Sequence, residues 1–464
     1  MIHHFKHKLI MAFTHKHVYI TFWIKVNSMA VGGNCMQIHV IRPNQSLTSI
    51  ARAFGTTVND IVEANELQNP NNLVVGQTLV IPIVGSFYWV QPGDSLWSIA
   101  SRFRMSYQEL ATVNRISVNQ PLIVGSRLYI PPRPKSRGEF NAYVEPRGSS
   151  VAPVLETSAR EAAPYLTYLA PFSFQALRDG SLKEPLLNNF PAIARANNNV
   201  LMMVITNQEN DQFSNELGRI LLNDMAIQDR FLNNIVATAK KYGFRDIHFD
   251  FEFLRPADRE AYNQFLRKAK ARFNQEGWLL STALAPKTSA EQQGEWYEAH
   301  DYKAHGQIVD FVVIMTYEWG YSGGPAMAVS PIGPVRDVLE YAITEMPASK
   351  ILMGQNLYGY DWTLPFVQGT IAKALSPQQA IALAAQRNVP IQYSTESQAP
   401  FFRYTDDEGK QHEVWFEDAR SIQAKFDLIK ELGLRGMSYW KLGLSFPQNW
   451  LLITENFNVR KIGR

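Results

Sequence analysis

The residues with the clearest chemical potential lie at 246–252, which read Asp-Ile-His-Phe-Asp-Phe-Glu. Apolar and polar residues alternate along this stretch, which is the period-2 pattern of a β-strand. One face of the strand carries three acids and His248, and neighbouring side chains on that face lie only about 7 Å apart. Because carboxyls this close resist ionising together, at least one is expected to keep its proton near neutral pH.

A protonated acid beside an ionised partner is what general acid catalysis of glycosidic cleavage requires. The alternative interpretation is the end of an exposed strand with a solvated acidic face. The alternating aromatic residues argue against that alternative, since exposed strands rarely place so many aromatics beside such acids.

The composition limits the classes of protein to consider. The chain of 464 residues is long enough for about two to four domains, and its 46% hydrophobic and 19% charged residues are typical of a globular protein. A net charge of +3 is too small, and too evenly spread, to indicate a nucleic-acid partner. Because Cys35 is the single cysteine, no intrachain disulfide or cysteine-based zinc site is expected, and we predict no metal and no cofactor.

Residues 1–35 are atypical, because half of the ten histidines lie here among lysines and aromatics. The apolar runs at 9–13 and 18–24 are both shorter than the roughly 18 apolar residues of a membrane span, so no span is predicted. We interpret the segment as a non-native or misassigned leader before a true start near Met29 or Met36. A degenerate export signal is the alternative.

An internal repeat follows, in which residues 39–82 align with residues 88–131 without a gap. Each copy predicts a strand, two helices and a closing strand that follows a glycine turn. Ser46 and Ser95 stand where the first helix of each copy needs an N-cap. A pair of generic βααβ spacers is the alternative interpretation.

The two copies resemble LysM modules, which we place at 37–83 and 86–132. The resemblance implies that they bind the N-acetylglucosamine units of peptidoglycan or chitin through shallow backbone grooves. A Pro-rich, basic stretch at 133–138 then predicts a short, semi-rigid linker.

From 139 to 464 apolar strands alternate with amphipathic helices, which is typical of a parallel α/β fold. Eight strand candidates with interleaved helices indicate a TIM (β/α)8 barrel, and a doubly wound sheet is the alternative. A segment at about 388–418 breaks the alternation and predicts a small α+β insertion, with antiparallel strands, between the seventh and eighth strands. The predicted strands are 140–144, 166–172, 200–206, 246–252, 279–285, 311–318, 351–358 and 436–442.

The chemistry of a TIM barrel lies at the C-terminal ends of its strands. In this chain those ends combine acids, tyrosines and a tryptophan, and they contain no Ser-His-Asp order, three-histidine set or phosphate-binding loop. Aromatic faces stack on sugar rings while carboxylates bind hydroxyls, so the composition predicts a carbohydrate cleft. Outside the fourth strand, the candidate residues are Asn207, Tyr317, Glu318, Trp319, Tyr358 and Trp440.

These ends resemble glycoside hydrolase family 18. The family's fourth-strand pattern Asp-Gly-x-Asp-x-Asp-x-Glu is matched by Asp250 and Glu252, whereas His248 stands where the family has an inner acid. Residues 315–318, Met-Thr-Tyr-Glu, are similar to the sixth-strand Met-x-Tyr-Asp, and Trp440 matches the eighth-strand tryptophan. The family's third-strand Ser-x-Gly-Gly is missing.

The resemblance implies substrate-assisted, retaining hydrolysis. In that mechanism Glu252 protonates the leaving oxygen, and the substrate's own acetamido carbonyl is the nucleophile. Asp250 orients the acetamido group and Tyr317 donates a hydrogen bond to its carbonyl. The residues expected to bind substrate are Trp440, His248, Glu318, Tyr358, Asn207 and Trp319.

Two LysM modules before such a barrel are similar to the spore-cortex N-acetylglucosaminidases of endospore-forming bacteria. The resemblance implies a monomeric hydrolase that cleaves β-1,4 bonds after N-acetylglucosamine in cortex peptidoglycan during germination, located in the spore coat or cortex region. An exported, wall-associated location is the alternative. A chitinase-like endo-acting glycosidase and a catalytically weak sugar-binding coat protein are the competing functions, and the presence of Glu252 argues against the second.

Overall fold

The computed structural model describes residues 37–132 and 134–463. The leader predicted at 1–35, together with both proposed start sites, lies outside the described residues. Within the described ranges, no helix is both long and apolar enough to cross a membrane.

The two repeats fold as predicted, each into two helices packed on a two-stranded antiparallel sheet. Ser46 and Ser95 are confirmed as N-caps: each accepts a hydrogen bond from the backbone N–H three residues on, and each forms a capping box with a second serine. The elements of the first repeat are β1 (Gln37–Val40), α1 (Leu47–Phe54), α2 (Val58–Asn65) and β2 (Thr78–Ile81). Those of the second are β3 (Ser86–Trp89), α3 (Leu96–Arg102), α4 (Tyr107–Asn114) and β4 (Arg127–Ile130).

The remainder of the chain is built around a closed parallel barrel, and all eight predicted strands are present. The strand order is β5-β6-β9-β12-β13-β14-β15-β21, and pairing of β21 with β5 closes the ring. The barrel strands are β5 (Ser136–Val144), β6 (Tyr168–Pro171), β9 (Val200–Thr206), β12 (Asp246–Asp250), β13 (Leu279–Leu284), β14 (Phe311–Ile314), β15 (Ile351–Asn356) and β21 (Gly436–Trp440).

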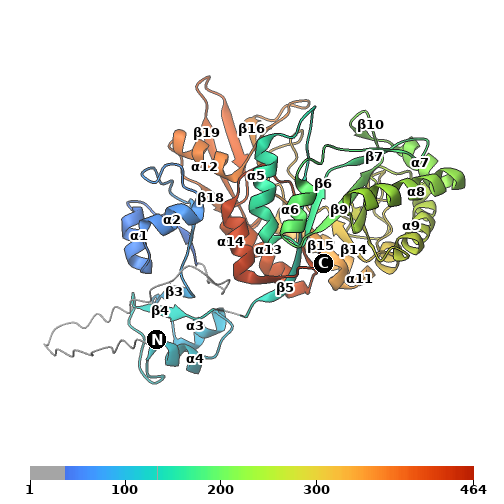
Figure 1. The fold of residues 1–464 in the computed structure, drawn as a ribbon. Helices are drawn as coiled ribbons and strands as arrows, with labels where there is room; N and C mark the ends of the chain where they lie inside the picture. The colour runs from blue at the N-terminus through green and yellow to red at the C-terminus, as the bar shows by residue number, and fades with distance from the viewer. Residues whose placement is uncertain (1–36, 133, 464) are drawn as a thin grey trace, which may run out of the picture. The chain divides into compact units, whose positions relative to one another are not determined.

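Helices surround the barrel. Figure 1 shows three of them, α8, α9 and α11, beside the strands β9 and β14. They are α5 (Pro153–Ala162), α6 (Phe190–Ala196), α7 (Asn215–Asn223), α8 (Met225–Tyr242), α9 (Arg259–Asn274), α10 (Tyr302–Ile308), α11 (Ile332–Glu345), α13 (Ala419–Leu432) and α14 (Pro447–Asn456). Short 3-10 turns lie at Ala163–Tyr165, Pro256–Asp258 and Ala348–Lys350, and short strands are β7 (Phe174–Ala176), β8 (Leu182–Lys183), β10 (Gln208–Glu209), β11 (Gln212–Phe213) and β22 (Phe457–Val459).

Alternation along β12 divides its side chains between two environments. Ile247, Phe249 and Phe251 are fully buried and belong to the large core between strands and helices. Asp246, His248 and Asp250 point the other way, into the barrel, and are also buried. The exposed-strand interpretation of this stretch is therefore excluded.

The insertion before the eighth barrel strand is larger than predicted. It begins at β16, directly after β15, so the helix at 377–386 belongs to the insertion and not to the ring of barrel helices. Its five strands are antiparallel, in the order β17-β16-β20-β19-β18. The elements are β16 (Gly359–Leu364), β17 (Lys373–Leu375), α12 (Pro377–Gln386), β18 (Gln392–Ser394), β19 (Ala399–Thr405) and β20 (Gln411–Trp415).

The first repeat is hydrogen-bonded to the catalytic region. The backbone N–H of Ile391 donates to Val75 O (2.9 Å), and Arg420 donates to Gly76 O (3.1 Å). Gly76 has φ +88°, and a Cβ there would lie 1.8 Å from the carbonyl oxygen of Ile391. Only glycine therefore fits this contact.

The second repeat exposes the residues that correspond to that contact. In the alignment Ile123 and Val124 correspond to Val74 and Val75, and their exposed fractions are 76% and 58%, against 6% for Val74 and 38% for Val75. Trp97, on α3, is 68% exposed. The two copies therefore share a fold but not an environment.

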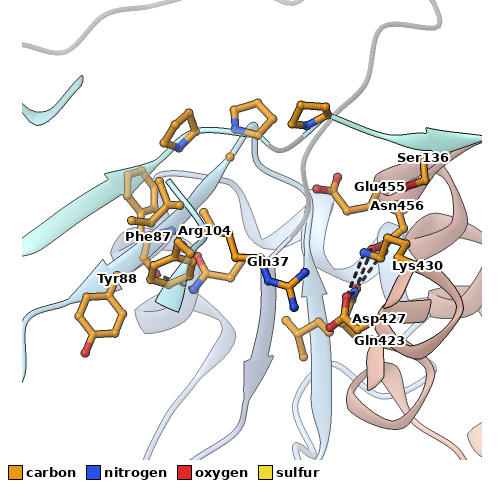
Figure 2. Close-up of a pocket in the computed structure, with 18 residues that line it drawn as sticks. Gln37, Phe87, Tyr88, Arg104, Ser136, Gln423, Asp427, Lys430, Glu455 and Asn456 are labelled. Atoms are coloured by element: carbon orange, nitrogen blue, oxygen red, sulfur yellow. Dashed lines mark hydrogen bonds and ion pairs between the residues drawn. The ribbon is translucent and has the colours of Figure 1, made fainter. Parts of the chain in front are cut away.

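A cavity of about 590 Å³ is lined by residues of both repeats and of α13 and α14. Figure 2 shows Phe87, Tyr88 and Arg104 on one side of it and Asp427 and Lys430 on the other. Lys430 pairs with Asp427 (2.9 Å) and donates to the Asn456 side chain (2.7 Å). None of the predicted catalytic residues lines this cavity.

We expect Asn65→Ala to destabilise the protein more than Asn114→Ala. Each asparagine ties its second helix to the closing strand; the Asn65 side chain accepts from Val80 N–H (2.8 Å) and donates to Val80 O (2.8 Å). Val80 is fully buried, so the alanine leaves two polar groups without partners, at a cost of about 1–3 kcal/mol each. At Asn114 the same bonds are only partly buried, so water can replace them. Thermal unfolding followed by circular dichroism checks this, and equal losses of Tm would contradict it.

Candidate active site

Glu252 lies two residues beyond Asp250, past the end of β12 at the C-terminal mouth of the barrel, with only 9% of its surface exposed. Its main chain is fixed by Asn207, whose amide accepts from Glu252 N–H (3.0 Å) and donates to Glu252 O (2.9 Å). His300 adds a third bond, since its Nε2 contacts Phe251 O (2.8 Å) while Nδ1 accepts from Ala285 N–H (2.8 Å). Asn207 is itself fully buried, so it fixes the main chain of Glu252 from the protein interior and does not face the cleft.

The Glu252 carboxyl receives a hydrogen bond from the indole N–H of Trp296, at 2.6 Å to Oε2. Trp296 comes from the long loop after β13 and stacks on Phe253, with ring centroids 6.2 Å apart and planes 13° apart. Phe253 has φ +53°, a left-handed conformation that is uncommon for a non-glycine residue. The indole therefore fixes the direction in which Glu252 presents its second oxygen.

Burial raises the proton affinity of both acids. Desolvation raises the pKa of Asp250, and desolvation together with the nearby Asp250 charge raises the pKa of Glu252 well above its usual range. The Trp296 bond acts in the opposite direction on Glu252. Two such close carboxyls do not both ionise readily, so near neutral pH the pair keeps at least one proton, which is the state that a general acid needs.

His248 lies in the barrel interior, beneath Asp250 and Glu252, and has no exposed surface. Its Nδ1 is 2.8 Å from Ser281 Oγ, and its Nε2 is 2.9 Å from the Tyr143 hydroxyl. Burial lowers the pKa of His248 to about 3, so the ring is neutral. The residue predicted to contact substrate is therefore placed where it contacts only the protein.

Tyr317 and Glu318 follow β14 and are partly buried. Glu318, which has φ +68°, accepts hydrogen bonds from the hydroxyls of Tyr358 and Tyr360 (3.0 Å for Tyr360), and burial raises its pKa. Gly354 on β15 makes room for Tyr317, because a Cβ there would lie 2.9 Å from the tyrosine ring.

Trp440 ends β21 and lies against two aromatic side chains of the barrel interior. Its ring centroid is 4.8 Å from that of Phe172 and 5.6 Å from that of Tyr143, both in edge-on contact. The next residue, Lys441, forms an ion pair with Glu145 at the end of β5. The indole thus packs against rings from β5 and from the residue that follows β6, with part of its surface exposed.

Trp319 lines a cavity of about 360 Å³ beside these residues. The same cavity is lined by Trp296, Tyr297, Tyr317 and Glu318, so it connects the loop after β13 with the end of β14. A hollow lined by four aromatic rings and two carboxyls, those of Glu318 and Asp337, suits a sugar chain, whose faces are apolar and whose edges carry hydroxyls.

The structure brings the predicted residues together in two layers. Asp250, Glu252, Tyr317, Glu318, Trp319, Tyr358 and Trp440 surround the mouth of the barrel, while Asn207 and His248 support them from beneath. Sequence reasoning missed Trp296, Tyr143 and Ser281. Tyr143 could have been found, because alternation along 140–144 points it inward; no local pattern marks Trp296, which lies in a loop. Among the described residues no group of three or more His, Cys, Asp or Glu side chains is arranged to hold a metal ion.

A buried acid with a raised pKa, a second carboxyl two residues before it and an aromatic floor define the site of a glycosidase on a TIM barrel. Residues 150–444 match Glycosyl hydrolases family 18, and residues 39–82 and 88–131 each match the LysM domain. The chain belongs to glycosyl hydrolase family 18 and carries two LysM domains.

The chain is similar along most of its length to proteins of spore-forming bacteria. It is 70% identical to the cortical fragment-lytic enzyme of Bacillus subtilis (strain 168), over 92% of this chain and 99% of that one. It is 59% identical, with a TM-score of 0.85, to the crystal structure of the Bacillus megaterium QM B1551 spore cortex-lytic enzyme SleL, covering 92% of this chain and all of that one. The Bacillus cereus spore cortex-lytic enzyme SleL matches at 53% identity and a TM-score of 0.86, over 93% of this chain and all of that one.

We expect Trp296→Phe to move the alkaline limb of the pH–activity profile to higher pH. The indole N–H favours the ionised form of Glu252, so its removal raises the pKa of the acid, which then stays protonated to higher pH. The profile of kcat/KM on cortex fragments measures the limb, and phenylalanine keeps the ring that stacks on Phe253. Trp278→Phe, before β13 at the far end of the barrel, is the matched control. A limb that does not move, or moves down, contradicts the assignment of Glu252 as the acid.

Proposed function

We propose that this protein hydrolyses the glycan of spore-cortex peptidoglycan at the β-1,4 bond that follows N-acetylglucosamine. The observation that carries the proposal is the pair of Asp250 and Glu252, buried at the mouth of a family 18 barrel with raised pKa values. The names of its relatives, which act on cortex or its fragments, give the proposed substrate.

In the first step Glu252 donates its proton to the glycosidic oxygen. The carbonyl oxygen of the substrate's own 2-acetamido group attacks C1 as the C1–O bond breaks, so the sugar becomes an oxazolinium ion and the shortened glycan leaves as an alcohol. Asp250 accepts a hydrogen bond from the acetamido N–H and balances the positive charge. Tyr317 donates a hydrogen bond to the attacking carbonyl, and Trp440 lies beneath the distorted sugar.

In the second step water attacks C1 from the face that the leaving group occupied. Glu252, now a carboxylate, takes a proton from that water, and the C1–O bond to the acetamido oxygen breaks to regenerate the N-acetyl group. Two inversions at C1 give net retention. The Trp296 N–H stabilises the carboxylate between the two steps, because it binds the charged form of Glu252.

Glu318, Tyr358 and Trp319 are proposed to bind the sugar that occupies the site, whereas Asn207 and His248 are proposed to act through the residues above them. The LysM domains bring the same N-acetylglucosamine-containing polymer to the cleft. We propose that the protein acts as a monomer in the coat or cortex region of the spore, without nucleic acid, metal or cofactor.

Glu252→Gln is expected to lower kcat by about 10²–10⁴-fold, the range that general acid catalysis supplies. Binding to purified wall should be unchanged, because the substitution keeps the size of the side chain and leaves the LysM domains intact. Release of new reducing N-acetylglucosamine ends from cortex fragments, read by mass spectrometry, measures turnover, and a pull-down with insoluble cortex measures binding. Glu396→Gln, on the exposed surface of the insertion, is the control.

The same assay on chitin oligomers separates the competing functions. Cleavage of cortex fragments with little cleavage of chitin supports the proposal. Cleavage of chitin alone supports the chitinase-like function, and binding without cleavage of either supports a sugar-binding protein. Full turnover by Glu252→Gln would overturn the mechanism.

A further inference from the structure

A continuous chain of hydrogen bonds crosses the barrel interior below the two acids. Ser281 Oγ lies 3.1 and 2.9 Å from the carboxyl oxygens of Asp246, His248 Nδ1 lies 2.8 Å from Ser281 Oγ, and the Tyr143 hydroxyl lies 2.9 Å from His248 Nε2. Each of the four residues is at least 96% buried. We call this set the buried chain; it joins β12, β13 and β5.

The buried chain has a direction, because a neutral histidine carries a single N–H. When Asp246 is ionised, Ser281 donates to it, His248 donates from Nδ1 to Ser281, and Nε2 accepts the Tyr143 proton. The tyrosine hydroxyl is then a donor to the histidine and has no proton for any other acceptor.

When Asp246 is protonated, the reverse arrangement becomes available, because the carboxyl now has a proton to donate. In that arrangement Asp246 donates to Ser281, Ser281 donates to Nδ1, and the Nε2–H of His248 donates to the Tyr143 oxygen. The Tyr143 proton is then free for another acceptor. Burial raises the pKa of Asp246 to about 8, which favours the protonated acid and makes this second arrangement accessible near neutral pH.

Asp250 is a charged acceptor available to this proton. Ser438 also lies beside Tyr143, where its hydrogen bond lowers the pKa of the tyrosine, and its Oγ accepts from Asn141 (2.9 Å). Asp250 is the strongest electrostatic influence on Tyr143, and its Oδ1 is buried without a hydrogen-bond partner among the described residues. A buried carboxylate oxygen without a donor is costly, which draws the hydroxyl to Asp250 once that acid ionises.

Several other ionisable groups face the two ends of the chain and act in both arrangements. Around Asp250 they are Glu252, Tyr262 on α9 and Tyr317 after β14; around Asp246 they are Glu139 on β5, Tyr168 on β6, Asp310 before β14 and Arg435 before β21. None of these joins the chain by a hydrogen bond, so the direction of the chain is set by Asp246.

We propose that Tyr143 is a positioning residue that donates a hydrogen bond to ionised Asp250, and that the buried chain of Asp246, Ser281 and His248 directs the tyrosine proton toward it. The neutral imidazole of His248 thereby takes the role of an inner acid behind Asp250. It directs the Tyr143 hydroxyl to the carboxylate without adding a second negative charge. The inference rests on the proposed role of Asp250.

The experiment measures the titration of Asp250 itself. The protein is labelled with ¹³C at the aspartate carboxyl, and the signal that Asp250→Asn removes is assigned to this residue. Tyr143→Phe deletes the donor and is expected to raise the pKa of Asp250. Ser281→Ala breaks the chain, leaves the tyrosine undirected, and is expected to raise it by less.

Two variants serve as controls. Ser281→Thr keeps the hydroxyl and is expected to restore the wild-type titration. Tyr439→Phe makes the same chemical change at a buried tyrosine that packs against Trp450, away from the chain, and should leave the titration unmoved. If Tyr143→Phe does not fold, the comparison of Ser281→Ala with Ser281→Thr decides the question.

The pH dependence of kcat on cortex fragments is measured in parallel. For Tyr143→Phe we expect kcat to fall about 10- to 100-fold with little change in KM, as for the loss of a hydrogen bond to a charged group. An unmoved Asp250 titration in Tyr143→Phe, or an equal shift in Tyr439→Phe, overturns the inference. A titration that moves while turnover does not would leave the buried chain established and overturn the catalytic role of Asp250.

Discussion

The cost of burying charge organises the functional half of this protein. β12 directs Asp246, His248 and Asp250 into an apolar barrel interior, and Glu252 stands at its rim almost without solvent. A buried carboxylate is unfavourable unless hydrogen bonds or opposite charge compensate it, so the groups respond by holding protons. The imidazole stays neutral for the same reason. The surrounding elements then supply single, directed hydrogen bonds in place of salt bridges, and the raised proton affinity that catalysis needs follows from the fold.

Most of the fold could be predicted because its signals are local. The apolar runs of the barrel strands, the serine caps and the gap-free repeat each lie within a few consecutive residues, and each was matched by the structure. The insertion was underestimated for an equally physical reason. The predicted seventh strand ends at 358, and β16, which begins at the next residue, is not recognised from the sequence as a separate strand. The helix α12 has the same amphipathic pattern as a barrel helix. No residue pattern in β16 or α12 indicates whether the segment belongs to the barrel or to the insertion.

The candidate site could be predicted only in part. Asp250, Glu252 and Tyr317 lie at strand ends, where topology alone brings residues together. Trp296 reaches Glu252 from a loop 44 positions away, and the partners of His248 come from two other strands. Such contacts depend on the closure of the barrel and on loop conformation, which composition does not encode. The sequence also does not show that Asn207 and His248 point into the protein interior and away from the cleft. A polar residue at the end of a strand can contact the substrate or the surrounding protein equally well.

The unequal surroundings of the two repeats bear on how the protein can be divided. The loop of the first repeat that carries Val75 and Gly76 is hydrogen-bonded to the insertion and to α13, whereas the corresponding loop of the second repeat is exposed. Duplication has therefore produced one copy that is part of the wall of the catalytic body and another that is attached to it. A chain cut at the linker would lose the bonds of the first repeat to the catalytic region. Because the second repeat lies between the first repeat and the barrel in the sequence, no truncation from the N-terminus can remove the exposed copy and keep the bonded one.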